Sequence, residues 1–269
     1  MAMQEGYWVV RTYEAGCVGE KTKFFVPGTR PTGKTRRREK AEIRKQEQNE
    51  YSALKSMARL IHANFSEGGL LLGLDYSDAG LEKAMQWARE EGMDPDAQSE
   101  EGINARWEAA AHALDNAMRR VKYRLKKQGL ELKAIYITSD MDGESGEFVR
   151  VHHHLIINKE AREAFVDAWK ELGHCAWSSL WEEQKDRTQL AEYLLRQVRR
   201  IPDAKKYRST RNLIRPVPKD RVVATDAEIR MPAGSEPLFR QEFKPGRPQY
   251  IRYVLPRFAS GRYKLPETV

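Results

Sequence analysis

The sequence contains little that would suit a membrane, secreted or disulfide-stabilised protein. It has only two cysteines in 269 residues, Cys17 and Cys175, so a disulfide framework is excluded and we expect thiols in a reducing compartment. The longest apolar runs, such as residues 70–72 and 155–157, are far shorter than the roughly 20 residues that span a bilayer. The first residues, MAMQEGYWVV, lack the basic and apolar regions of a secretory signal. We therefore expect a cytoplasmic protein with no membrane partner.

Positive charge is concentrated in two segments of a chain whose formal net charge is +8. Residues 21–45 and residues 193–221 each hold ten Lys or Arg and two acidic residues, so each segment has a net charge of +8. The rest of the chain therefore has a net charge of −8. Basic charge that is confined to particular segments indicates binding to a polyanion such as nucleic acid.

Hydrophobic periodicity predicts a mixture of strands and helices. Short apolar or alternating segments predict strands at residues 7–12, 23–26, 70–74, 130–138, 148–157 and 175–181. Apolar residues three and four apart predict helices at residues 41–63, 107–125, 159–172 and 188–200. Eight of the twelve prolines lie in residues 216–269, which we therefore interpret as an irregular extension.

Two histidines on the strand expected at residues 148–157 point to the same side. Side chains of a strand alternate between its faces, so His152 and His154 share one face while His153 points to the core. Residues two apart in a strand are about 7 Å apart, which suits two imidazoles that bind one divalent ion. The structural alternative is one buried histidine and two surface histidines without a metal.

A metal ion at this pair needs further ligands, and the acidic residues of the hairpin turn are the nearest candidates. If the turn is a three-residue loop centred on Gly146, Asp140 lies opposite His152, and a shift of one residue moves it to the other face. We take Asp140 as the third ligand, with Glu147 as the alternative. Two nitrogens and a carboxylate oxygen, with open positions left over, favour a catalytic Mn²⁺ or Mg²⁺ over a closed structural zinc site.

A tyrosine with two arginines on the same side of a helix is the second candidate group. In the helix expected at residues 188–200, Tyr193 lies at the edge of the apolar stripe, and Arg196 and Arg200 share its side. Arginine binds phosphate through two parallel hydrogen bonds. A phenol with a pKa of about 10 needs a nearby cation or metal to act as a nucleophile. The alternative is a half-buried tyrosine between solvated arginines.

Residues Gly28–Thr35 match the P-loop pattern GxxxxGK[ST], which makes a P-loop ATPase an alternative function. A P-loop helix needs apolar residues in its first turns, but the sequence that follows Thr35 is RRREK. The next expected elements are helices and a hairpin rather than repeated strand–helix–strand units. We therefore interpret this segment as a basic loop.

The chain resembles the HUH endonucleases, specifically the rolling-circle replication initiators (Rep proteins) of small phages and plasmids. That family carries a His-hydrophobe-His motif on a central strand, which His152 and His154 match with a third histidine between them. Its helix motif, a tyrosine followed three residues later by a basic residue, matches Tyr193 and Arg196. Gln197 stands one turn after the tyrosine, where some members have a second one, so the chain looks like a single-tyrosine initiator.

The resemblance covers roughly residues 1–215 and implies an α+β fold with a central antiparallel sheet flanked by helices, to which the proline-rich residues 216–269 add the irregular C-terminal extension. We therefore expect three segments: residues 1–57 with N-terminal strands and a basic arm, residues 58–215 with the nuclease core, and residues 216–269 with the extension. A metal held by His152, His154 and Asp140 would act with Tyr193 to nick and rejoin single-stranded DNA at a replication origin through a 5′-phosphotyrosine.

In this scheme Arg196 and Arg200 neutralise phosphate charge. No helicase segment is evident, so a host helicase and polymerase are the expected partners. A non-catalytic DNA-binding phage or plasmid protein remains an alternative function. A relaxase or transposase of the same superfamily is a closer variant.

Overall fold

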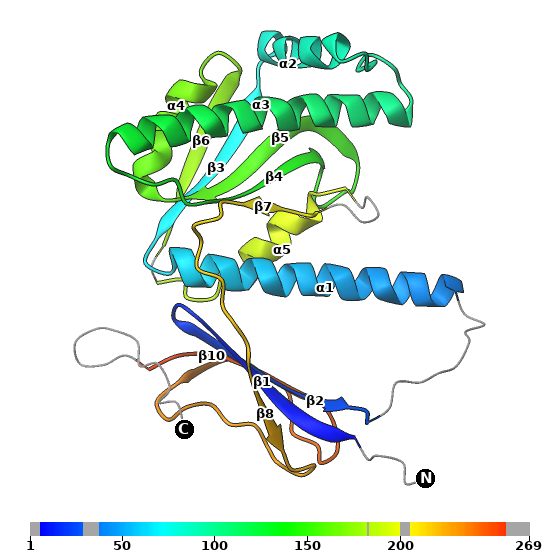
Figure 1. Ribbon diagram of the computed structural model, residues 1–269, viewed down its shortest axis with the longest axis vertical. Helices are drawn as coiled ribbons and strands as arrows, with labels where there is room; N and C mark the ends of the chain where they lie inside the picture. Colours follow the sequence, from blue (N-terminus) through cyan, green and yellow to red (C-terminus); the bar gives the residue numbers. More distant parts are fainter. Residues whose placement is uncertain (1–5, 29–37, 182, 200–204, 257–269) are drawn as a thin grey trace. The chain divides into compact units, whose positions relative to one another are not determined.

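The computed structural model describes residues 6–28, 38–181, 183–199 and 205–256, and only the backbone of residues 38–47. In these ranges the chain is an α+β protein with two antiparallel five-stranded sheets (Figure 1), so the predicted class is confirmed. None of the described helices is both long and apolar enough to cross a bilayer. Contacts divide the chain into two compact units.

Unit 2 consists of residues 67–184 and 188–213 and contains the sheet with strand order β6-β3-β5-β4-β7. Its strands are β3 (Gly69–Tyr76), β4 (Ala134–Met141), β5 (Phe148–Ile157), β6 (Gly173–Leu180) and β7 (Arg208–Ser209). Its helices are α2 (Asp78–Glu90), α3 (Glu100–Lys127), the 3₁₀ turn η1 (Lys159–Ala161), α4 (Arg162–Trp169) and α5 (Thr188–Arg196).

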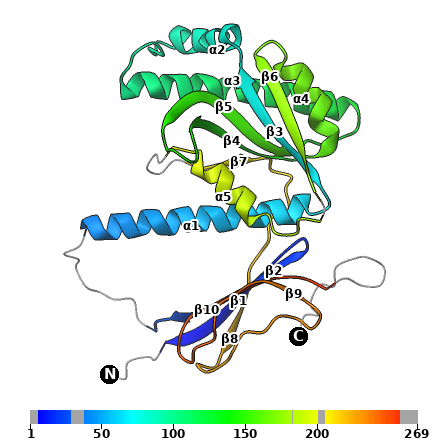
Figure 2. The ribbon, with the colours of Figure 1, turned by 180° about the vertical axis from the view of Figure 1, so that it is seen from behind.

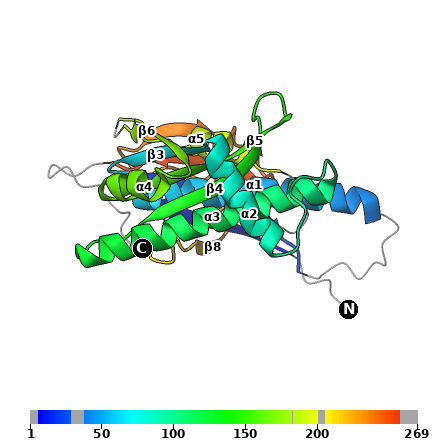
Figure 3. The same ribbon diagram turned by 90° about the horizontal axis from the view of Figure 1, so that it is seen from above.

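Helices α2, α3 and α4 cover one face of this sheet, as Figures 1 and 3 show. Along β3 the side chains of Leu72, Leu74 and Tyr76 are buried and join the core formed with these helices. The intervening residues of β3 are half-buried or exposed. This alternation gives the sheet one apolar face and one polar face, and the polar face carries the chemistry described below.

Helix α5 lies beside β4 and β7 (Figure 2). On the β3–β6 part of the polar face, which α5 leaves open, His174, Ala176 and Ser178 of β6 are exposed. The main-chain O of Gln197, just after α5, accepts a 2.6 Å hydrogen bond from Ser139 Oγ on β4. The apolar side of α5 contributes the buried Ala191 and Leu194. The helix ends at Arg196, four residues before the predicted end, and the residues after 199 lie outside the described ranges until residue 205.

Unit 1 consists of residues 1–66, 185–187 and 214–269, so it joins the two ends of the chain in one unit. Its sheet has the strand order β8-β1-β2-β10-β9. Its described elements are β1 (Tyr7–Ala15), β2 (Val18–Val26), α1 (Arg38–Phe65), β8 (Lys219–Val223), β9 (Glu236–Arg240) and β10 (Gln249–Val254). Arg59 on α1 is ion-paired with Glu20 on β2 at 2.8 Å, so α1 contacts the sheet through charged groups.

The prediction of an irregular C-terminal extension was wrong, because residues 216–256 supply three strands to the sheet of unit 1. The prolines do not prevent this pairing. Pro237 lies on β9, an edge strand, where a missing N–H is tolerated. Ile251 and Tyr253 alternate with more exposed residues along β10 and are buried. The segments 1–57 and 216–269, which were expected to be separate, thus belong together.

Candidate active site

The histidine pair lies on β5, the middle strand of the sheet in unit 2. His152 and His154 are on the polar face, and their Nε2 atoms are 3.1 Å apart. Val151, His153 and Leu155 are buried, whereas the two histidines of the pair are only partly buried. The predicted alternation along this strand is therefore confirmed.

Hydrogen bonding directs the lone pair of His152 toward its neighbour. His152 Nδ1 lies 2.9 Å from the main-chain O of Arg150, and because a carbonyl oxygen can only accept, Nδ1 must donate. In the neutral ring the unprotonated nitrogen is then Nε2, which faces His154. Carbonyl groups orient metal-binding histidines in the same way. Burial, and then the charge of His152, lowers the pKa of His154 to about 4, so its ring is neutral at pH 7.

His153 has a structural role on the opposite face, as predicted. Its ring is completely buried, with Nε2 2.9 Å from the hydroxyl of Tyr76 and Nδ1 3.1 Å from Thr138 Oγ1. Burial lowers the pKa of His153 to about 3, so this histidine stays neutral in the folded protein. Two hydrogen bonds satisfy both of its ring nitrogens, which explains how a polar residue is accommodated in this core.

Gln197 completes a group of three donor atoms that the sequence did not lead us to expect. Its Oε1 lies 2.9 Å from His154 Nε2 and 3.4 Å from His152 Nε2. The bond from Ser139 to the main chain of Gln197 attaches the end of α5 to β4 and so positions this side chain. The only signal in the sequence was its place four residues after Tyr193, one helical turn later.

The Nε2 atoms of His152 and His154 and the Oε1 atom of Gln197 form a triangle, which we call the donor triangle because each atom could donate a lone pair to a metal ion. It has the dimensions of one face of a metal coordination shell. Its edges are 2.9, 3.1 and 3.4 Å long. Around an ion with bonds of about 2.1 Å, neighbouring ligand atoms are about 3.0 Å apart in an octahedron and about 3.4 Å apart in a tetrahedron. Two imidazole nitrogens and an amide oxygen at these distances could therefore hold one divalent ion, with coordination positions left over.

Replacing Gln197 by leucine is expected to lower the affinity for Mn²⁺ about 10- to 100-fold, because it removes one of three donor atoms. Gln197→Glu, which keeps an oxygen there, should bind the ion at least as well as the native protein. Gln189→Leu, on the exposed side of α5, is the matched control. Calorimetric titration with Mn²⁺ measures all three, and an unchanged affinity of Gln197→Leu would remove Gln197 from the site.

Tyr193 is placed beside the histidine pair by α5. Its ring centroid lies 6.0 Å from that of His154, and half of its side chain is exposed. The structure therefore brings together three residues that the sequence pointed to separately: the two histidines and the tyrosine. A half-exposed phenol ring therefore stands next to the two imidazoles.

Of the two arginines expected near Tyr193, only Arg196 lies in the described part of the chain. Arg196 is exposed and forms an ion pair with Glu192 one turn earlier on α5. Arg200 lies outside the described residues. Arg196 is thus on the same helix as the phenol, in a position open to a polyanion.

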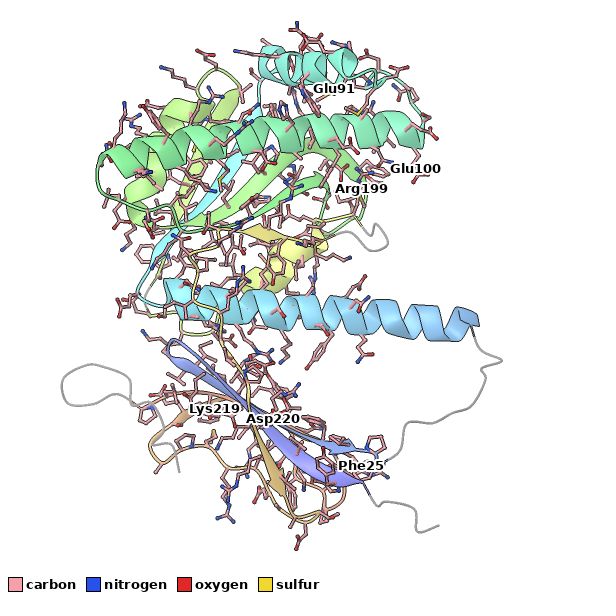
Figure 4. The ribbon with its side chains drawn as sticks, viewed as in Figure 1. Phe25, Glu91, Glu100, Arg199, Lys219 and Asp220 are labelled. Carbon is pink, nitrogen blue, oxygen red and sulfur yellow. The ribbon has the colours of Figure 1, made fainter. Side chains whose placement is uncertain are left out.

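The predicted register of the hairpin was wrong. Ser139, not Asp140, lies opposite His152, because the pairing shifts between Ser139 and Met141. Asp140 is buried and pairs with Arg199 at 2.8 Å. Arg199 lies near Glu100 at the start of α3 (Figure 4) and donates a hydrogen bond to Asn104. Burial raises the pKa of Asp140, and the charge of Arg199 opposes this rise.

Neither of the two carboxylates expected as the third ligand completes the histidine pair. Glu147, the alternative ligand, is exposed in the hairpin turn. In the described part of the chain no three His, Cys, Asp or Glu side chains come together as a metal site. The oxygen that accompanies the two imidazoles is the amide oxygen of Gln197.

The P-loop alternative gains no support from the described residues. Gly28 is the last described residue before a gap, and residues 29–35 of the motif lie outside the described ranges. The preceding strand β2 belongs to an antiparallel sheet, whereas a P-loop follows a strand of a parallel sheet.

No protein-family model, curated protein or solved structure matches this chain.

Proposed function

We propose that this protein is a metal-dependent tyrosine endonuclease of the HUH type, which nicks and rejoins single-stranded DNA as a rolling-circle replication initiator of a phage or plasmid. One observation carries the proposal: Tyr193 and Gln197 are one turn apart near the end of α5, and both meet the histidine pair on the polar face. If the tyrosine and the histidine pair had only structural roles, their side chains would not need to meet at one place.

The reaction would exchange one phosphodiester bond for another. The phenol oxygen of Tyr193 attacks the phosphorus, the bond from phosphorus to the 3′ oxygen breaks, and that oxygen takes up the proton that the phenol loses. The 5′ phosphate stays on Tyr193, and the 3′-OH primes synthesis by a host polymerase. Attack of a 3′-OH on the phosphotyrosine reverses the exchange and rejoins the strand, so no nucleotide triphosphate is consumed.

His152, His154 and Gln197 would hold the divalent ion. When bound there, such an ion polarises the scissile phosphate and stabilises the negative charge of the transition state. The carbonyl of Arg150 keeps the Nδ1 proton on His152, so its Nε2 lone pair stays directed at the site. Tyr193 needs only to approach the phosphate from the open side of this group.

The part of the polar face that α5 leaves open would seat the DNA strand. Gly73 on β3 lies directly opposite His154, and Ala176 on β6 lies directly opposite Gly73. Gly73 has no positive φ, and a Cβ atom added to it would meet nothing within 4 Å. Glycine weakens the interior of a strand, and neither backbone conformation nor crowding requires it at position 73. Close approach of a ligand would explain why a glycine stands there.

Replacing Gly73 by valine is therefore expected to impair nicking about 100-fold, because the added methyl groups displace the phosphate from the donor triangle. The melting temperature and Mn²⁺ affinity should be preserved, since the new side chain has space and β-branched residues suit strands. Ser178→Val, on the same face one cross-strand row farther from the histidines, is the control. Equal nicking by both variants would show that DNA does not pass over Gly73.

The proposed function is tested by searching for the covalent intermediate. The protein is incubated with Mn²⁺ and a random-sequence pool of single-stranded DNA labelled at its 3′ ends. A denaturing gel should show labelled DNA attached to the protein, and EDTA should prevent this. If DNA binds with the same affinity with and without EDTA and never becomes attached, the protein is a non-catalytic DNA-binding protein.

A further inference from the structure

The C-terminal part of α3 carries a dense group of exposed positive charges. Residues 119–127 read RRVKYRLKK and contain no acidic residue. Only Val121 and Leu125 of this segment are buried, and they attach it to the core of unit 2. We call the remaining exposed residues the α3 basic surface: Arg119, Arg120, Lys122, Tyr123, Arg124, Lys126 and Lys127.

The cations of the α3 basic surface form two rows with an aromatic side chain between them. At about 100° per residue, Tyr123 points away from the buried stripe of Val121 and Leu125. Its side chain is 63% exposed. Three cations lie on each side of it. One row consists of Arg119, Lys122 and Lys126, and the other of Arg120, Arg124 and Lys127.

This arrangement does not stabilise the helix. Like charges three or four residues apart repel each other, and Arg120–Arg124 and Lys122–Lys126 are such pairs. The helix dipole favours cations only in the last turn. It therefore accounts for Arg124, Lys126 and Lys127 but not for Arg119, Arg120 and Lys122. Helix stability therefore does not explain the pattern of cations, whereas binding of a negatively charged partner would explain it.

Few carboxylates neutralise the surface. Arg124 contacts Asp167 on α4, and the nearby Glu171 is ion-paired with Lys83. No ion pair joins Arg119, Lys122 or Lys126 to a carboxylate in the described part of the chain. Other acidic residues, such as Glu91 and Glu100, lie near the N-terminal end of α3 (Figure 4).

The surface is also separate from the candidate active site. Val121 and Leu125 pack into the core on the helical side of the sheet, with Leu155 and Tyr76. The histidine pair lies on the opposite face. A nucleic acid segment bound along α3 therefore cannot be the same segment as the one that Tyr193 would cut.

We propose that the C-terminal part of α3 docks in a groove of duplex DNA, with one row of cations toward each phosphate backbone and Tyr123 toward the groove floor. A single strand has one line of phosphates, whereas the two rows match the two backbones that border a major groove, which admits an α-helix. The inference extends the proposed function by adding a duplex-binding surface, but duplex binding requires no nuclease activity.

The test compares two triple variants that remove the same charge. Arg119→Gln, Lys122→Gln and Lys126→Gln are combined in one protein. The control combines Arg230→Gln, Arg240→Gln and Lys244→Gln, three exposed residues of unit 1 that already have glutamate neighbours. Affinities for a labelled 20-base-pair duplex and for a single strand of equal length are measured by fluorescence anisotropy over a range of salt concentrations.

The α3 variant should bind the duplex at least about tenfold more weakly than the control. Its slope of log affinity against log salt should be lower by about 2 to 3, since each phosphate that a cation neutralises contributes about 0.9 to the slope. Single-strand affinity should change little. Equal duplex binding by the two variants, or an equal loss for duplex and single strand, would overturn the assignment. Duplex binding that depends on α3 in a protein that forms no covalent adduct would refute the nuclease and leave this inference standing.

Discussion

Tyr193→Phe is expected to abolish the covalent adduct and strand nicking, with at least about a 1,000-fold loss of rate, because no other atom of the side chain can attack phosphorus. DNA binding and Mn²⁺ affinity should remain, since the hydroxyl contributes to neither the donor triangle nor the basic segments. Half of the Tyr193 side chain is exposed, so loss of its hydroxyl should not affect folding. The rate is measured from the cleaved fraction of a labelled single strand on a denaturing gel.

Tyr7→Phe is the matched control for this variant. Tyr7 is similarly exposed, at 48%, and belongs to unit 1. It should nick DNA at the native rate. Native nicking by Tyr193→Phe would instead mean that a different nucleophile, such as water, attacks the phosphate, and the phosphotyrosine mechanism would have to be given up.

His152→Ala and His154→Ala are each expected to lower the affinity for Mn²⁺ by at least about 100-fold, because each removes a nitrogen of the donor triangle. Nicking should fall below detection in both variants and in the native protein treated with EDTA. The folded state should survive, because both side chains are only partly buried. Calorimetric titration with Mn²⁺ and circular dichroism measure these two properties.

His174→Ala provides the comparison for metal binding. His174 is exposed on β6 and lies across from Asp75, on the same face of the sheet as the pair. Its loss should leave the Mn²⁺ affinity unchanged. If all three histidine variants bind Mn²⁺ equally well, the convergence of His152 and His154 has a structural cause and the ion binds elsewhere or not at all.

The local elements of this protein were predictable because they depend on short-range periodicity. The strand expected at residues 148–157 is β5 with the same bounds, and its alternation places His153 in the core. The helix expected from Trp107 is part of α3. Tyr193 was recognisable because its helix has a clear apolar stripe, which buries Leu194.

Features that depend on pairing between distant segments were not predictable. Asp140 was assigned to the histidine pair on an assumed register, but the irregularity between Ser139 and Met141 places Ser139 opposite His152. The prolines of residues 216–269 predicted an irregular extension. Three short strands nevertheless form there, because β1 pairs with β8 and β2 pairs with β10, which in turn pairs with β9.

Local periodicity is enough to predict which residues share a face: the two histidines through the two-residue period of a strand, and Tyr193 with Gln197 through the turn of a helix. The tertiary structure decided that these two pairs meet, because only the packing of α5 against β4 brings an amide oxygen to within 2.9 Å of an imidazole 43 residues away. A contact between distant residues depends on the packing of whole elements, and local periodicity carries no information about that packing.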